Sequence, residues 1–327
     1  MKWLNRIFFA VGLACLVGTV AAVGPGTIAD AAVHLGAWFW PLAAVNLLWY
    51  AADARGWARV LGPSGRSPGM AGRLIWATVA GEAVNNATPL MNLGGEPVKG
   101  LLLRGRVPAD TVVASLVVDN TIRYLATFVF LAIGLGLSLG MLDLEPRVRG
   151  GLAVAFAAIA VLVGLAFGLQ ARGLLGRALD LGRRLGIRPG AIERHRPAAD
   201  RIDAAIGGFY RGRRVDFAAS MAWHLASRSI ATVDAAVLLT LMGCPVGILQ
   251  ALLIQTVSVL LNLVFAFIPL QIGAAEGGHL VLFQALGMDP ATGVAFSLVR
   301  RVRGLLWIGV GLLVGMAMSR GRAADAA

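Results

Sequence analysis

Residues 88–100, TPLMNLGGEPVKG, interrupt a chain that is otherwise mostly Leu, Ala, Val and Gly. The stretch contains two prolines, a Gly-Gly pair, a glutamate and one of the two lysines of the chain. Proline and glycine break helices, and broken backbone at membrane depth is tolerated only where protein or a water-filled cavity covers it. The stretch therefore predicts a broken membrane helix that the rest of the protein covers.

The composition of the whole chain indicates an all-α polytopic membrane protein. Of the 327 residues, 58% are hydrophobic and 14% are charged, and the mean hydropathy is +0.76. A soluble core of this size cannot hide so much apolar surface. Since roughly 20 helical residues cross a hydrocarbon core of about 30 Å, we expect about seven full transmembrane helices plus broken or re-entrant helical hairpins. The expected spans are residues 7–23, 36–54, 109–140, 150–169, 217–242, 247–268 and 292–318.

The net charge of +12 comes mainly from arginines that lie between the expected spans. Eleven of these arginines fall in residues 170–215. Positive loops stay on the cytoplasmic side, so we expect both termini to be cytoplasmic. The basic face favours anionic lipid head groups as partners rather than nucleic acid. The first 24 residues resemble a secretory signal sequence, but six further spans follow them, and we expect an uncleaved first helix.

Residues 170–215 form the one sizeable extramembrane segment that we expect in a single membrane domain of residues 1–327. Apolar residues recur in this segment at helical spacing against arginines, which predicts a basic amphipathic helix on the cytoplasmic head groups. Pro189 and Pro197 are expected to break the chain before a second short helix that contains Ile206. No catalytic soluble domain remains to be placed.

Residues 74–103 are expected to form a re-entrant hairpin. Arg73 and Arg104 mark cytoplasmic boundaries on either side, and the 30 residues between them are too few for two full helices. A single crossing would place the arginine-rich segment outside. We therefore expect the chain to enter and leave on the same side. The expected structural residues of this hairpin are Pro89, Gly94, Gly95 and Pro97.

A second interruption, IPLQIGAAEGGH at residues 268–279, predicts a broken-helix region over residues 247–286. Pro269 precedes a glutamate by seven residues, as Pro89 does in the first region. The two regions enter from opposite sides in this topology, which resembles the inverted repeats of carriers. A chance similarity without symmetry is the alternative. The expected structural residues here are Pro269, Gly273 and Gly277.

Ionisable residues inside spans are costly, and they are commonly functional or paired with one another. Asp119 and Arg123 lie four residues apart and share a helix face, so we expect them to form an internal ion pair. Arg228 falls near the middle of its expected span, where a guanidinium group needs a carboxylate, carbonyls or a ligand. These residues mark the interior of the expected helix bundle.

The last expected span carries three arginines into the membrane, because residues 304–318 alone are too short to cross. Arg300 and Arg303 share a helix face, and guanidinium groups match phosphate oxygens, which favours a site for a lipid head group. The alternative is that Glu96 and Glu276 neutralise the arginines in a locked interior. The candidate substrate-binding residues are Glu96, Lys99, Arg228, Glu276, Arg300, Arg301 and Arg303.

The two interrupted motifs resemble those of a flippase-like membrane family that includes the transmembrane half of lysylphosphatidylglycerol synthases and shorter proteins encoded with hopanoid biosynthesis. The resemblance extends over roughly residues 10–318. Many members carry a Glu-Arg pair ahead of an Asp after the first motif, whereas this chain has Asp119, Asn120 and Arg123, so no role is carried over for that element. The matching motif residues are Pro89, Gly94, Gly95, Glu96, Pro97, Lys99, Pro269, Gly273, Glu276 and Gly277.

The resemblance implies transport of a polar-headed or anionic lipid, such as a hopanoid, a phospholipid or a polyprenyl-phosphate lipid, between leaflets of the bacterial inner membrane. The soluble aminoacyl-transfer domain of the synthases is lacking here, so lipid aminoacylation is not implied. The sequence has no HExxH motif, nucleotide-binding glycine loop, His/Cys cluster or clear nucleophile. We therefore expect no enzyme, no catalytic residue, no cofactor and no metal. The alternatives are a membrane-embedded lipid-modifying enzyme and a non-catalytic scaffold of a lipid-synthesis complex.

Overall fold

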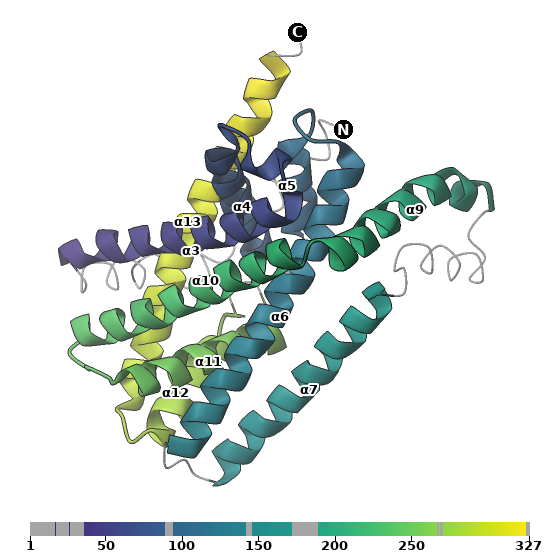
Figure 1. Cartoon of the computed structure of the whole chain (residues 1–327). Helices are drawn as coiled ribbons and strands as arrows, with labels where there is room; N and C mark the ends of the chain where they lie inside the picture. The colour runs from purple at the N-terminus through teal and green to yellow at the C-terminus, as the bar shows by residue number, and fades with distance from the viewer. Residues whose placement is uncertain are drawn as a thin grey trace.

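Helices dominate the computed structural model, which describes residues 17, 26, 36–88, 94–141, 146–171, 189–266, 268 and 271–324 (Figure 1). No strand occurs within these residues, which confirms the expected all-α class. The short 3-10 helices are η1 (Gly36–Trp38) and η2 (Ser64–Arg66). The α-helices are α3 (Phe39–Leu61), α4 (Met70–Ala87), α5 (Gly95–Leu103), α6 (Ala109–Met141), α7 (Pro146–Ala171), α9 (Pro189–Gly212), α10 (Arg214–Leu241), α11 (Ile248–Val264), α12 (Ala274–Ala285) and α13 (Pro290–Ala324).

Six of the seven expected spans coincide with helices, namely α3, α6, α7, α10, α11 and α13. The expected span 7–23 lies outside the described residues. The expected span 247–268 coincides with α11, whose 17 residues are short for a crossing of about 30 Å. Among the described helices, two are long and apolar enough to cross a membrane, at Ala109–Leu137 and Pro290–Ser319. The count of seven spans stays a prediction.

Helices α4 and α5 pack against each other as a hairpin. Nε of Arg73 donates to the carbonyl oxygen of Leu102 at 3.5 Å, which joins the open end of the hairpin. Further in, a Cβ atom on Gly95 would lie 2.1 Å from the carbonyl oxygen of Gly81, so this approach requires glycine. The backbone N–H of Gly95 donates to Oδ1 of Asn85 at 2.6 Å. The hairpin has the shape expected for this region, and its re-entry into a membrane stays a prediction.

The predicted hairpin residues have different local roles. Gly94 is the N-cap of α5, and Pro97 lies in the first turn, where a missing N–H costs no helix bond. Gly273 is the N-cap of α12 with a φ angle of +82°, a conformation that favours glycine. Gly277 lies inside α12 with open space around its Cβ position. Pro89 and Pro269 lie outside the described residues.

Helices α11 and α12 form a second hairpin at the opposite end of the molecule from the first (Figure 1). Helix α13 packs against both α4 and α12 and therefore contacts both hairpins. Helices α6 and α13 run in opposite directions (Figure 1). The order of helix, hairpin and long helix thus occurs twice, as α3, α4–α5, α6 and as α10, α11–α12, α13. This order agrees with the inverted repeat that the sequence suggests.

Helix α9 packs on the protein through its apolar face. Ile202, Ile206 and Phe209 are buried in a cluster with residues of α3 and α6. The helix contains Pro197, so the expected break at this residue is wrong. Packing of the apolar face against α6 stabilises the helix through the proline, because tertiary contacts outweigh local propensity. Residues 172–188, where the first amphipathic helix is expected, lie outside the described residues.

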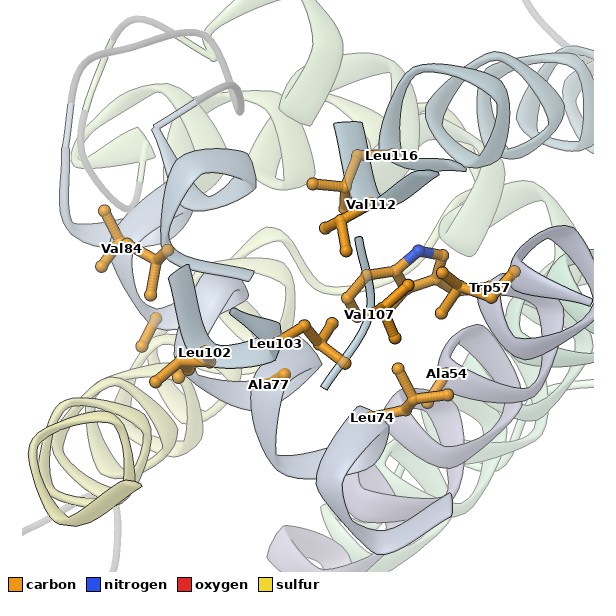
Figure 2. Packing of buried hydrophobic residues seen from close by; sticks show 14 of the residues in the cluster. Ala54, Trp57, Leu74, Ala77, Val84, Leu102, Leu103, Val107, Val112 and Leu116 are labelled. Carbon is orange, nitrogen blue, oxygen red and sulfur yellow. The ribbon is translucent and has the colours of Figure 1, made fainter. Parts of the chain in front are cut away.

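A buried apolar cluster joins the first hairpin to α3 and α6 (Figure 2). The side chain of Trp57 on α3 is 1% exposed, and its Nε1 donates to Oγ of Ser115 on α6 at 3.1 Å. Leu74 and Leu103, from the two arms of the hairpin, belong to the same cluster as Val107. The cluster extends along the hairpin from Leu74 and Leu103, near its open end, to Val84 and Ala87, near the end of α4.

Candidate functional site

A cavity of about 280 Å³ lies where α3, α4, α6, α10, α11, α12 and α13 meet. Both hairpins contribute to its wall, through Ala83 of α4 and Ala275 of α12 among others. Five arginines and two carboxylates give the lining an excess of positive charge. The charged lining residues are Asp53, Glu82, Arg123, Arg228, Arg300, Arg301 and Arg303.

Glu82, Glu96, Lys99 and Arg123 form one ion cluster beside the cavity. Nζ of Lys99 lies 3.2 Å from Oε1 of Glu82 and 3.0 Å from Oε1 of Glu96. The guanidinium group of Arg123 lies 2.6 Å from the same oxygen of Glu82 and 3.2 Å from that of Glu96. Two carboxylates thus balance two cations, as buried ions require. Glu96 and Lys99, which are candidate substrate-binding residues, have internal partners here and do not line the cavity.

The expected ion pair between Asp119 and Arg123 does not form. Arg123 bonds with Glu82, Glu96 and the side chain of Asn120, which lies three residues before it on α6. Asp119 lies against His224 of α10 instead. Spacing along one helix predicts a shared face, but carboxylates on α4 and α5 reach the guanidinium group and give it two partners. The tertiary contacts therefore replace the local pair.

Asp53, His224 and Asp119 form a buried trio that connects α3, α10 and α6. Nδ1 of His224 lies 2.9 Å from Oδ1 of Asp53, and Nε2 lies 3.1 Å from Oδ1 of Asp119. Gly56 makes room for the ring, because a Cβ atom there would lie 2.9 Å from Nε2. Sequence reasoning missed Asp53 and the contact between these helices. The only signal was that ionisable residues recur inside expected spans.

The three arginines of α13 all line the cavity, but they have separate partners. Arg303 is 1% exposed and makes a bidentate contact with Asp234 of α10. Nη1 donates to Oδ1 at 2.8 Å, and Nη2 donates to Oδ2 at 2.5 Å. Arg301 pairs with Glu276 of α12 at 2.8 Å. Since Glu96 pairs elsewhere, the expected neutralisation of these arginines holds for Glu276 alone. Arg300 is left with neutral partners.

Arg228 and Arg300 have no carboxylate oxygen within 4 Å among the described residues, although both line the cavity. Arg300 donates from Nη1 to Oε1 of Gln255 and to Oγ of Ser258, each at 3.0 Å, and lies over the ring of Phe296. Arg228 donates to Oγ1 of Thr127 at 3.1 Å. Unpaired guanidinium charges are costly in a low-dielectric interior. An anion in the cavity would reduce this cost.

Two neutral polar side-chain atoms of the cavity lining have no partner within the described residues. Oδ1 of Asn46 and Nε1 of Trp49 are buried without a hydrogen bond. Buried polar atoms are normally satisfied, and an exception requires an explanation such as water or a ligand. Both residues lie on α3, so α3 supplies neutral polar groups whereas α10 and α13 supply the unpaired cations.

Comparison with known proteins shows the family. Residues 5–312 match the family model described as the lysylphosphatidylglycerol synthase TM region. The chain belongs to this family. A UPF0104 membrane protein of Methanothermobacter thermautotrophicus (strain ATCC 29096 / DSM 1053 / JCM 10044 / NBRC 100330 / Delta H) is 23% identical to this member over 321 residues, which are 92% of the chain and 91% of the relative. No solved structure gives a significant match.

Membership in the lysylphosphatidylglycerol synthase TM region family confirms the resemblance seen at the two interrupted motifs. It is consistent with a multi-pass membrane location and indicates a role connected to membrane lipids. Within the described residues of this family member, no group of three or more His, Cys, Asp or Glu side chains is arranged to hold a metal ion. The cavity lining offers guanidinium groups, carboxylates, amides, hydroxyls and the imidazole of His279.

Proposed function

We propose that this protein is a lipid transporter that moves a lipid with an anionic or polar head group between the leaflets of the bacterial inner membrane. The observation that carries this proposal is the pair of unpaired guanidinium groups of Arg228 and Arg300 in a cavity between two broken hairpins. Family membership supports the link to lipids. A hopanoid, a phospholipid and a polyprenyl-phosphate lipid remain the candidate substrates.

The size of the cavity fits a head group rather than a whole lipid. Small-molecule sites have volumes of roughly 300–1,000 Å³, and the volume of about 280 Å³ lies just below this range. The acyl or ring portion of the substrate would stay in the bilayer beside the protein. The unpaired cations of α10 and α13 bind the anionic group, while Asn46 and Trp49 of α3 satisfy its neutral polar atoms.

Access from both sides follows from the opposed hairpins. In carriers with inverted repeats, rocking of one repeat against the other exposes a central site alternately to each side of the membrane. The hairpin α4–α5 lies toward one end of the molecule and α11–α12 toward the other (Figure 1), and both line the cavity. We propose that alternate opening of the two hairpins moves the head group across.

The orientation in the membrane follows from the basic end of the molecule. Arg213 donates to the carbonyl oxygens of Val60 and Arg59, which joins the start of α10 to the end of α3. Arg201 of α9 pairs with Asp110 of α6 at this same end. We propose that this end is cytoplasmic, as the positive-inside rule predicts, and that it contacts anionic head groups.

The transport proposal is tested in proteoliposomes with a labelled phosphatidylglycerol and an assay of leaflet exchange. The double variant Arg228→Gln/Arg300→Gln keeps hydrogen-bond donors but removes both charges, and exchange should fall to the rate of protein-free vesicles. Arg201→Gln removes an exposed arginine far from the cavity and should leave the rate unchanged. Undiminished exchange in the double variant would remove the two arginines from the mechanism.

A lipid-modifying enzyme is the second candidate, because Oγ of Ser258 lies 2.8 Å from Nε2 of His279 in the wall of the cavity. A hydroxyl beside an imidazole is the arrangement of an activated nucleophile. Ser258 also lies 2.8 Å from the carbonyl oxygen of Ile254, a contact that serves packing within α11. We propose that no covalent change occurs. Mass spectrometry of the lipids after incubation, with Ser258→Ala as the control, distinguishes the two candidates.

A further inference from the structure

The trio of Asp53, His224 and Asp119 has no role in head-group binding as described above, yet it reaches the cavity through Asp53. The side chain of His224 is 2% exposed, that of Asp119 is 9% exposed and that of Asp53 is 22% exposed. Asp53 also lines the cavity. A proton that enters the cavity therefore reaches the trio at Asp53, while the other two residues are shielded.

The number of protons on the trio decides whether both of its contacts are hydrogen bonds. Both ring nitrogens of His224 face a carboxylate oxygen. Two labile protons, on the ring or shared with one carboxyl group, make both contacts favourable. With a single proton, one contact sets a nitrogen lone pair against a carboxylate and opens. Loss of one proton therefore weakens the link between α10 and either α3 or α6.

The charges around the ring come from each neighbouring helix. On α3 the group facing the ring is Asp53, and on α6 it is Asp119, while Arg123 of α6 acts electrostatically on Asp53. Helix α11 contains no ionisable residue. Helix α9 adjoins the first turn of α10, about two turns from the ring, where Arg213 pairs with Asp216. The proton count is thus set by two carboxylates and by cations at the cavity.

One of these cations is Arg228, which lies one turn beyond His224 on the same face of α10. Asp53 and Arg228 act on each other electrostatically. An anion on Arg228 adds negative charge beside the trio and favours its doubly protonated form. Linkage is reciprocal, so the doubly protonated trio favours the anion. Binding of a head group and binding of a proton therefore reinforce each other.

We propose that Asp53, His224 and Asp119 form a proton-binding site that couples the movement of one proton to the movement of one anionic lipid in the same direction. This inference rests on the proposed function. The bound proton compensates one negative charge of the lipid, so the coupled step carries no net charge across the membrane. Opening of one contact of the trio on proton release frees α10 to move relative to α3 or α6.

The coupling is tested with the full chain in phosphatidylcholine proteoliposomes that contain labelled phosphatidylglycerol, with the membrane potential clamped. A gradient of one pH unit should drive the lipid toward the alkaline leaflet, with a leaflet ratio of up to about tenfold, because a factor of ten corresponds to about 1.4 kcal/mol. His224→Gln and Asp119→Asn should lose this response and equilibrate the leaflets. Asp110→Asn, which changes an exposed carboxylate, should retain it.

If the wild type exchanges the lipid between leaflets but does not respond to the pH gradient, the coupling is overturned and the transport function is retained. A response that persists in both trio variants also overturns it. Absence of exchange in the wild type contradicts transport of this lipid, and proton binding is then judged separately by titration of ¹⁵N-histidine-labelled protein in nanodiscs. The His224 resonance is assigned by its absence in His224→Gln. A chemical shift of this resonance that stays constant between about pH 5 and 9 overturns the proton site.

Discussion

The hairpins α4–α5 and α11–α12 have similar lengths and both carry a glutamate in the first turn of their second helix, but they neutralise charge differently. In the first hairpin Glu96 shares Lys99 and Arg123 with Glu82, and the four charges balance. In the second hairpin Glu276 caps α12 through the N–H of Gly273 and pairs with Arg301. No second carboxylate of that hairpin reaches Arg300.

The same contrast extends to the two halves of the molecule. The interior of α3–α6 holds four carboxylates and two cations, whereas that of α10–α13 holds two carboxylates and four arginines beside His224. The excess charges of the halves have opposite signs and attract each other across the interface. Four of the five arginines that line the cavity belong to the second half. The residues concerned are Asp53, Glu82, Glu96, Lys99, Asp119 and Arg123, and then Arg228, Asp234, Glu276, Arg300, Arg301 and Arg303.

The largest effect on stability is expected from breaking the buried ion pair of the second half, between Asp234 and Arg303. Asp234→Asn leaves the guanidinium group of Arg303 buried without its carboxylate. Removing one partner of a buried pair costs about 3–5 kcal/mol, which unfolding in mixed micelles measures. Asp110→Asn breaks an exposed pair and should cost no more than about 1 kcal/mol. Equal losses in the two variants would contradict the burial of this pair.

The packing of the two hairpins can be compared by substituting one glycine in each and measuring the free energy of unfolding. Gly95→Ala drives a Cβ atom into the backbone of Gly81, which cannot move away. For Gly278→Ala the three nearest atoms all belong to the side chain of Leu261, which can rotate. We expect a loss of about 1–3 kcal/mol or more for Gly95→Ala and a smaller loss for Gly278→Ala. Gly277→Ala, with open space at the Cβ position, is the control, and the reverse order would show that the first hairpin is the looser one.

The shared carboxylates of the first hairpin predict a non-additive effect. Glu82→Gln or Glu96→Gln alone leaves each cation one carboxylate, and each single loss should be about 1 kcal/mol. The double variant leaves Lys99 and Arg123 without either partner. Its loss should exceed the sum of the single losses by about 0.5–3 kcal/mol in a double-mutant cycle. Simple additivity would show that the four residues do not act as one cluster.

The smallest effect is expected at the start of the long helix of the second half. Asp289 accepts hydrogen bonds from the N–H groups of Ala291 and Thr292 and from the Thr292 hydroxyl, which hold the pKa of its carboxyl below the usual range. A lowered folded-state pKa gives stability that is present at neutral pH and is lost as pH falls through that value. Asp289→Ala should lower the melting temperature slightly at pH 7 and have no effect at about pH 2. An equal effect at both values would exclude the carboxylate as the cause.

The helices were largely predictable, because long apolar runs and Pro-Gly interruptions act locally. The breaks near Gly94 and Gly273 follow from the conformations that these residues permit. The same local rule fails at Pro197, where the helix continues past the proline. Ile206 and its neighbours on α9 are buried against α6, and this packing stabilises the helix. A sequence shows where a proline stands, but it does not show what packs against the helix around it.

The candidate site was predictable in part. The cost of ionisable residues inside a membrane identified Arg228 and Arg300, and both line the cavity. The pairing was not predictable, because partners lie far apart in the chain. Asp234 and Arg303 are 69 residues apart, and Asp53 and His224 are 171 residues apart. Spacing rules within one helix therefore assigned Arg123 to the wrong carboxylate.

The position of α13 between the hairpins has a consequence for kinetics. Val79 and Ala83 of α4 lie so close to Gly311 that a Cβ atom there would overlap them, and Gly293, near the other end of α13, lies equally close to His279 and Phe283 of α12. We therefore expect a tilt of α13 to move both hairpins at the same time. The distances between spin-label pairs placed across each hairpin should therefore change with the same rate constant, because the two hairpins move together.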